Sequence, residues 1–452
     1  MVTGYKNLII LMACIFFAQA GDSATVLPET RLPLNRVSPI KPGTPIKVKI
    51  FPHRRDYPPQ GLDVVKDRVT IKANQPCSIY QGAKNRASRV GKRVSKAKTI
   101  QLVASQLNSA KWIHCKGPAT LVRGEGLTAF RYDGSFYVHR IGNGADATLE
   151  VINVVSLKTY LLGVVPSEVY PNWHIETLKT QAVAARTYAV FHLGQMRAKN
   201  HKRRLWDVDD TIAFQAYTGA TMRSDRTDLA VNSTIGQIIT HENDVIQAYY
   251  HADSGGQTED AVNVWNQDIP YVKGRKENFE FELSSSAWEK KVALSQFTAK
   301  LRSMGYLRAK ETLKGLWIPV AGTTESGRVR VVTLQLKGQD KYRNITVEAF
   351  KRAAGRLPST MFSMTLVREK KKQMIAISGF GSGHGVGMSQ QGAALLASDK
   401  GWTYDQILSY YYSGTEICSL KDNDAEKPNC YLNLESASPA KKKTDSLSSS
   451  HS

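Results

Sequence analysis

The sequence lacks a long apolar run near its N-terminus. The apolar stretch from Leu8 to Phe17 is too short to span a bilayer comfortably. It leads to Ala18-Gln19-Ala20 before Gly21, and this A-x-A pattern is typical of a secretory signal peptide and its cleavage site. We expect export, removal of residues 1–20 and no transmembrane span afterwards. An uncleaved anchor is the alternative. Residues 11–14 loosely resemble a lipidation motif in which Cys14 would carry the lipid.

Cysteines are few, and none has the close CxxC spacing of a zinc site. Removal of the signal peptide leaves Cys77, Cys115, Cys418 and Cys430, an even number in an oxidising compartment. We expect local pairing of Cys77 with Cys115 and of Cys418 with Cys430. Four cysteines allow three pairings, and free buried thiols are the other alternative.

Acidic residues are also scarce relative to basic ones. The chain has 39 Asp and Glu against 61 Lys and Arg, and its formal net charge is +22. Such a surplus attracts polyanions and negatively charged surfaces. Because an exported protein does not meet nucleic acid, we expect anionic envelope polymers or lipids as partners. Solvated surface charge without a specific partner is the alternative.

Nucleotide-binding motifs are absent from the glycine-dense segment GFGSGHGVGMSQQGA. The third glycine of GxGxxG would fall at Val386, and no GKS or GKT occurs there. We expect its glycines to let the backbone approach a ligand or another strand closely. The segment predicts no bound cofactor.

Hydrolase and metal motifs are absent as well. A triad of Ser254 or Ser389 with His251 or His384 is conceivable, but no GxSxG surrounds either serine. His251, His384 and Asp253 are metal-ligand types without HExxH or paired-cysteine spacing. The sequence therefore favours neither a serine triad nor a metal site.

The pattern that is present predicts an α+β protein with mixed β-sheet regions and helices, preceded by a small β-rich region. Short β-type runs separated by glycine turns precede residue 157, with a basic loop expected from Lys84 to Lys98. The predicted segments are a signal peptide (1–20), a proline-rich linker (21–45), a β-rich region (46–127), a main domain (128–414), an extension with a disulfide (415–434) and a disordered tail (435–452).

Further elements are predicted from residue 225 onward. Helices are expected at Asp225–Ser233, Phe279–Tyr306 and Val347–Ala354 and after a capping Ser389, and Tyr404–Tyr412 is expected to be the last ordered element. Strands are expected at 236–251 and Val329–Leu336, with a hairpin from Met364 to Ser378.

The stretch from Tyr160 to Gly194 carries one acidic side chain, Glu168, at its first turn. We expect an apolar strand, a turn flanked by prolines, and then an amphipathic helix that is capped by Asn172 and stopped by Gly194. Valines on both sides of Glu168 would remove water from its charged form and raise its pKa, as suits general acid and base work. An ordinary turn with Glu168 solvated or near the helix start is the alternative.

Three segments together, YLLGVVPSEVYPNWHIETLKTQAVAARTYAV, HADSGGQTED and GSGHGVGMSQQGA, resemble the sporulation stage II protein D family, or SpoIID/LytB domain. The likeness runs from about Thr128 to Gly414. It implies a peptidoglycan lytic transglycosylase that cuts glycan strands, often after their stem peptides have been removed. The family's catalytic glutamate falls on Glu168, and the family groove implicates Gln181, Arg186, Ser254, Thr258, His384, Ser389 and Gln390.

The resemblance also has departures and rivals. Some relatives carry cysteines, associated with a metal, where this chain has DVDDTIAFQAY and the histidine-containing loop without cysteine, so no zinc is expected. The LytB name in the family suggests an alternative function, that of a noncatalytic wall-binding protein that activates an amidase. A third class is an envelope structural protein that binds anionic polymer through its net charge.

Overall fold

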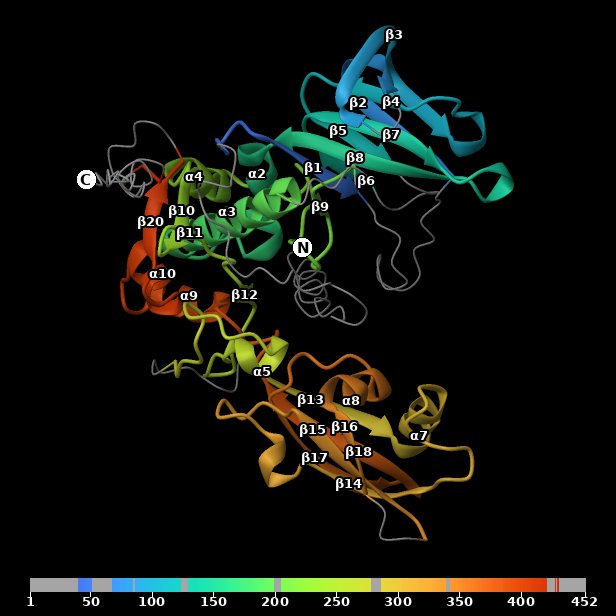
Figure 1. Ribbon diagram of the computed structural model, residues 1–452, viewed down its shortest axis with the longest axis vertical. Helices are drawn as coiled ribbons and strands as arrows, with labels where there is room; N and C mark the ends of the chain where they lie inside the picture. The colour runs from blue at the N-terminus through green and yellow to red at the C-terminus, as the bar shows by residue number, and fades with distance from the viewer. Residues whose placement is uncertain are drawn as a thin grey trace, which may run out of the picture.

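The computed structural model describes residues 40–50, 67–83, 86–122, 129–198, 205–277, 286–338, 342–420, 427 and 429–430. The predicted signal peptide, most of the linker and the predicted tail lie outside these residues. The fold is α+β, as predicted. An N-terminal sheet and a helical middle layer lie side by side toward one end of the long axis, and a C-terminal lobe lies at the other end (Figure 1). Within the described residues, we find no helix with the length and apolar character needed to cross a membrane.

A nine-stranded sheet forms the N-terminal part. Its order is β6-β5-β2-β4-β7-β8-β1-β9, and β3 pairs with β2. The strands are β1 (Pro45–Ile50), β2 (Arg68–Ala83), β3 (Arg86–Val103), β4 (Lys111–His114), β5 (Ala119–Val122), β6 (Ala129–Tyr132), β7 (Ser135–Ile141), β8 (Thr148–Ser156) and β9 (Val208–Asp209). The sheet contains strands on both sides of residue 128, and the predicted division of the chain there stays a prediction.

Strand β3 replaces most of the basic loop predicted from Lys84 to Lys98, so that prediction is wrong from Arg86 onward. Most side chains from Gly91 to Thr99 are exposed. A strand exposed on both faces shows no alternation of apolar and polar residues, and therefore gives no sequence signal.

Both predicted disulfides are confirmed: Cys77 pairs with Cys115, and Cys418 with Cys430.

Helix α2 (Leu157–Glu168) follows β8 directly, and the apolar strand predicted for this stretch is wrong. Ser156 caps the helix by accepting a hydrogen bond from the backbone N–H of Thr159 over 3.0 Å. All but the second, third and last two residues of the helix are buried. An apolar run buried on every side has no periodicity that would separate a helix from a strand.

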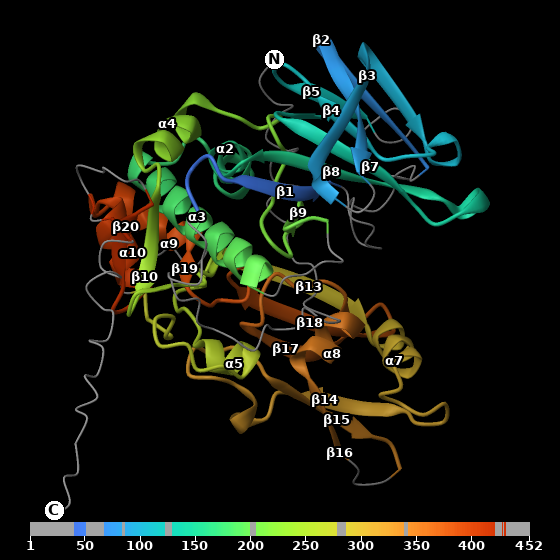
Figure 2. The same ribbon diagram turned by 45° about the horizontal axis from the view of Figure 1, so that its top comes forward.

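Helix α3 (Ile175–Ala198) crosses the middle of the molecule between the N-terminal sheet and the C-terminal lobe (Figure 2). Leu178, Ala182, Ala185 and Ala189, which recur at helical spacing, are all buried. The helix begins three residues after Asn172 and continues through Gly194, so both predicted ends are wrong.

The rest of the middle layer surrounds α3. It consists of α4 (Asp225–Ser233), β10 (Gln237–His241), β11 (Asp244–Val245), β12 (Tyr250–His251), α5 (Ala261–Trp265), β19 (Met388–Ser389), α9 (Gln390–Ser398), α10 (Tyr404–Tyr411) and β20 (Glu416–Ser419). Helix α4 and the cap of α9 by Ser389 are confirmed. The strand predicted for 236–251 is divided, because Glu242 and Asn243 take left-handed φ values of 50° and 63° and form a turn.

The C-terminal lobe contains two three-stranded sheets, β13-β18-β17 and β14-β15-β16. Its elements are β13 (Ala287–Ala293), α7 (Leu294–Ser303), β14 (Leu313–Trp317), β15 (Val331–Leu336), β16 (Tyr342–Thr346), α8 (Val347–Ala354), β17 (Phe362–Glu369) and β18 (Lys372–Phe380). Helix α8, strand β15 and the β17–β18 hairpin are confirmed. The long helix predicted from Phe279 to Tyr306 is wrong at 287–293, which pair with β18; residues 278–285 lie outside the described residues.

Candidate active site around Glu168

Glu168 is the last residue of α2 and is half-buried. Its Oε1 accepts a hydrogen bond of 2.7 Å from the backbone N–H of Ala216, in the segment after β9. Gly163 brings that segment close to α2, since a Cβ at this position would lie 2.5 Å from the carbonyl oxygen of Gly219. The carboxyl group is therefore held by a close backbone approach between α2 and residues 216–219.

The surroundings of Glu168 favour its neutral form. Burial raises the pKa of Glu168 from 4.5 to about 7, because little water remains to solvate a charged carboxylate. Hydrogen bonds from the Ala216 backbone and from the side chains of Gln390 and Tyr250 act in the opposite direction. The last turn of a helix, where the dipole is negative, also disfavours an anion. The group is therefore poised to hold and release a proton near neutral pH.

A chain of neutral hydrogen bonds leads from Glu168 into the core. The hydroxyl of Tyr160 donates to Oε1 of Gln215 over 3.2 Å, and Nε2 of Gln215 donates to the hydroxyl of Tyr250 over 3.0 Å. Because Tyr250 accepts from Gln215, its own proton is available to Glu168. Tyr250 and Gln215 are not identifiable as site residues from the sequence, since neither stands in a motif with local spacing to Glu168.

Two of the predicted groove residues lie at this site. Nε2 of Gln390 donates to Oε1 of Gln181 over 3.3 Å, and the Gln390 side chain also hydrogen-bonds to Glu168. Gln181 is buried on α3 and its Nε2 has no hydrogen-bond partner among the described residues. The structure thus brings together side chains from α2, α3 and α9.

Ser254 and Ser389 form a second cluster, centred on the buried carboxyl group of Glu277. The Ser254 hydroxyl donates to Oε2 of Glu277, and the Tyr411 hydroxyl donates to Oε1 over 2.6 Å. The Ser389 hydroxyl accepts from the backbone N–H of Ser254 over 3.3 Å and from that of Gly392 over 3.1 Å. Burial raises the pKa of Glu277. These contacts fix the loop after β12 against α9 and α10.

Thr258 and His384 occupy two further positions. Thr258 is buried and exchanges hydrogen bonds with the backbone of Arg275. His384 is half-buried, its Nδ1 accepts from the N–H of Val386 over 3.0 Å, and its ring lies 5.1 Å from that of Trp265. Burial, assisted by the positive charge of Arg328, lowers the pKa of His384 to about 4, so it is neutral at pH 7.

Arg186 lies apart from these groups. Its guanidinium is buried and donates to the carbonyl oxygens of Gln237 and Val231, each over 3.1 Å. Burial lowers the pKa of Arg186 to about 9, which leaves it charged at pH 7. The geometry ties α3 to α4 and β10, and we therefore assign Arg186 to the core rather than to a ligand.

The alternative serine and metal sites do not assemble. Within the part of the chain that the structure describes, neither the Ser254 nor the Ser389 hydroxyl is hydrogen-bonded to a histidine. Nδ1 of His251 donates to the carbonyl oxygen of Val386 over 3.1 Å. The same described residues contain no group of three or more His, Cys, Asp or Glu side chains placed to hold a metal ion.

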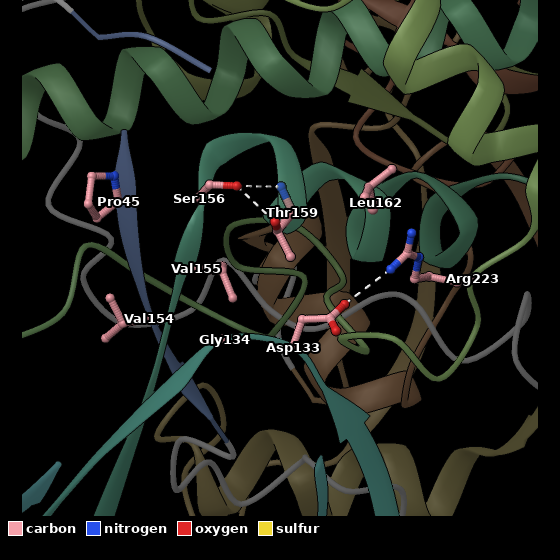
Figure 3. Close-up of a pocket in the computed structure, with 9 residues that line it drawn as sticks. All are labelled: Pro45, Asp133, Gly134, Val154, Val155, Ser156, Thr159, Leu162 and Arg223. Atoms are coloured by element: carbon pink, nitrogen blue, oxygen red, sulfur yellow. Dashed lines mark hydrogen bonds and ion pairs between the residues drawn. The ribbon is translucent and has the colours of Figure 1, made fainter. Parts of the chain in front are cut away.

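A cavity of about 540 Å³ lies between β8 and α2, and Glu168 is not among the residues that line it (Figure 3). Ser156, Thr159 and Leu162 line it from the start of α2, and Arg223 reaches Asp133 across it with an N–O distance of 3.1 Å. None of the predicted site residues lines this cavity. We therefore place the candidate active site at Glu168 on chemical grounds rather than in this hollow.

Comparison with known families gives two matches along the chain. The model of a stage II sporulation protein family (SpoIID) matches residues 145–241, which include α2, α3 and Glu168. A domain of unknown function (DUF8618) matches residues 259–387, which include the C-terminal lobe.

Three related proteins extend the match. An uncharacterized protein of Brachyspira hyodysenteriae (strain ATCC 49526 / WA1) is 31% identical over 270 residues, covering 60% of this chain and 68% of that protein. The amidase enhancer of Bacillus subtilis (strain 168) is 31% identical over 296 residues, covering 57% of this chain and 40% of the relative. Stage II sporulation protein D of the same strain is 32% identical over 283 residues, covering 58% of this chain and 74% of the relative. The chain belongs to the stage II sporulation protein D family.

Proposed function

We propose that this protein is an exported peptidoglycan lytic transglycosylase in which Glu168 is both the catalytic acid and the catalytic base. The observation that carries the proposal is a carboxyl group with a pKa of about 7 whose hydrogen-bonding neighbours, Ala216, Gln390 and Tyr250, are all neutral. Glycoside hydrolases use two carboxyl groups. A transglycosylase that closes a ring within its substrate needs only one.

The proposed reaction is balanced by one proton cycle. Protonated Glu168 donates to the glycosidic oxygen, the bond from that oxygen to C1 of the muramic residue breaks, and the leaving sugar keeps the proton on its 4-hydroxyl. The Glu168 carboxylate then accepts the proton of the muramic C6 hydroxyl. That oxygen bonds to C1 and forms the 1,6-anhydro ring, so no water is consumed and Glu168 is protonated again.

The neighbouring groups divide into two proposed roles. Gln181 and Gln390 lie at Glu168 and would hydrogen-bond to sugar hydroxyl or N-acetyl groups, while half-buried His384 would line the groove as a neutral imidazole. Ser254, Thr258 and Ser389 have their hydroxyls engaged within the protein, so they would act by shaping the loop that faces the glycan.

A second candidate function is a noncatalytic wall-binding protein that activates an amidase. The likeness to an amidase enhancer favours this function, and the aligned region covers 40% of that relative's length. The two functions differ in whether this chain itself makes a covalent product.

The test is product analysis on purified sacculi and on peptide-free glycan. The transglycosylase proposal requires 1,6-anhydromuramic ends, identified by mass as chains lacking one water relative to hydrolysis products, and their loss with Glu168→Gln. Anhydro ends from Glu168→Gln at the parent rate would refute the assignment of Glu168. A parent protein that forms no ends but accelerates an added amidase would support the second function.

A further inference from the structure

An exposed aromatic pair lies on the outer face of the β14-β15-β16 sheet, in the C-terminal lobe. The Trp317 and Tyr342 residues are 40% and 56% exposed, and their rings meet edge to face with centroids 5.5 Å apart. Val320, in the turn after β14, is fully exposed. Large exposed aromatic side chains gathered on one surface of a soluble protein mark an interaction site.

The strand register identifies the side chains that share this face. Trp317 is opposite Thr333, which is opposite Asn344, and in the next row Gly315 is opposite Gln335, which is opposite Tyr342. The other face carries Val332 and Leu334, buried at 0% exposure in the core of the lobe with α7 and α8. Two aromatic rings, the exposed Asn344 and the half-buried Gln335 therefore lie on this outer face, around Thr333, which is buried.

Charge on the lobe narrows the class of ligand. The sequence of residues 286–380 has 19 Lys and Arg against 6 Asp and Glu, a surplus of 13 positive charges within a total of +22. Lys337, in the turn directly after β15, is exposed. A long anionic ligand would be attracted to this lobe.

We propose that this outer face, through Trp317 and Tyr342, binds an acidic amino-sugar glycan strand. Aromatic rings pack on the C–H faces of sugar rings, the amides of Gln335 and Asn344 match hydroxyl and N-acetyl groups, and the surplus of cations matches the lactyl carboxylates of muramic residues. This inference rests on the proposed function and adds a second contact for the same polymer, in the region matched by a domain of unknown function.

The experiment measures binding without cleavage. Fluorescent peptide-free glycan oligomers are titrated with the full chain carrying Glu168→Gln, and Trp317→Ala and Tyr342→Ala are added to it singly and together. Each single substitution should weaken binding about tenfold, as for an aromatic anchor of an interface. Trp317→Phe keeps a ring and should recover most of the affinity. Leu229→Ala on α4, where the leucine is 59% exposed, is the matched control and should change nothing.

A second arm tests the charge. Lys337→Ala should weaken binding at low ionic strength and have little effect at 1 M salt, where charges are screened within about 3 Å. Amidation of the glycan carboxylates should reproduce this loss and make binding insensitive to Lys337→Ala. Equal binding of free and amidated glycan at low salt would overturn the assignment of an acidic ligand.

Two outcomes would overturn the proposal for the aromatic pair. One is unchanged glycan binding by the folded double variant, with folding checked by its thermal transition. The other is self-association of the parent, measured by sedimentation, that the double variant loses while it keeps glycan binding; the face would then join two copies of the chain. A parent that makes no anhydro ends refutes the transglycosylase function alone, because the binding arm does not depend on turnover.

Discussion

Ala216 and Glu168 are joined by a hydrogen bond of 2.7 Å, from backbone N–H to Oε1, across 48 residues of sequence. A backbone donor cannot rotate away as a side chain does, so the position of this oxygen is set by how closely the segment carrying Ala216 lies against α2. That approach depends on Gly163, because its missing Cβ would lie 2.5 Å from the carbonyl oxygen of Gly219 and 2.7 Å from the ring of Tyr217.

Gly163→Ala should therefore impair both stability and activity. A methyl group at that position would push the segment away from α2, cost roughly 1–3 kcal/mol of the free energy of unfolding and lengthen the Ala216 contact to Glu168. We expect a lower kcat in the fraction that remains folded, measured with anhydro-end formation and denaturant unfolding. Gly43→Ala is the matched control, since a Cβ there meets nothing within 4 Å. Normal kcat in folded Gly163→Ala would show that the backbone contact is dispensable.

Glu168→Gln should stabilise the protein at neutral pH while it abolishes product. The folded-state pKa of Glu168 is raised from 4.5 to about 7, so its contribution to stability is fully present below pH 4.5 and is lost as the pH rises to about 7. A neutral amide does not incur this loss. The variant should unfold at about the same denaturant concentration as the parent at pH 4 and be more stable at pH 8 by on the order of 2 kcal/mol, with allowance for partial solvent access.

The control for this comparison is Glu289→Gln, which changes an exposed carboxyl group on β13. It should leave the difference between pH 4 and pH 8 unchanged. If Glu168→Gln and the parent show parallel stability curves over the whole range, then the pKa of Glu168 is not raised in the folded protein.

The α+β fold class follows from the sequence, whereas only part of the hydrogen-bond network around Glu168 does. Glu168, Gln181 and Gln390 stand in motifs long enough to identify, and the structure places them together. Tyr250 and Gln215 contact the same site, but their contacts join separate segments of the chain and leave no local spacing to detect. A hydrogen-bond network of this kind becomes visible only when the tertiary structure brings its members together.

The errors in secondary structure have a common physical origin. Residues 160–165 are apolar and all buried, so their pattern fits a strand as well as a helix. The sequence does not predict strand β3 for the opposite reason: its exposed stretch from Gly91 to Thr99 has no apolar face. Elements with one buried face, such as α4 and α8, were predicted with correct bounds.

Tyr250→Phe tests the chain of hydrogen bonds behind Glu168. The Tyr250 hydroxyl lowers the pKa of Glu168, so its removal should raise that pKa further above its ordinary value. In the parent, kcat/KM should fall as the pH rises through about 7, where the catalytic acid loses its proton. In the variant, this descending limb of the pH profile should shift to higher pH, and kcat should be lower by roughly 10- to 100-fold.

A merely structural role for Tyr250 would lower activity without moving the pH limb, and that outcome would contradict the proposed contact. Tyr410→Phe is the matched control. Its hydroxyl donates over 2.9 Å to the carbonyl oxygen of Lys276, and its loss should not move the limb.

For Arg186, the family resemblance and the observed contacts predict different roles. The family groove implicates this position in ligand binding, whereas its guanidinium is buried and donates to the carbonyl oxygens of Gln237 and Val231. Arg186→Ala should leave both carbonyl groups without these donors and lower the free energy of unfolding by roughly 3 kcal/mol or more. Per folded molecule, KM for peptide-free glycan should stay within about twofold of the parent, because a core residue contributes no substrate contact.

Gln181→Leu is the contrasting variant. Gln181 lies at Glu168, and its buried Nε2 has no partner among the described residues. Loss of this amide should raise KM or lower kcat with a smaller change in stability. A raised KM in folded Arg186→Ala, equal to that of Gln181→Leu, would return Arg186 to the substrate groove.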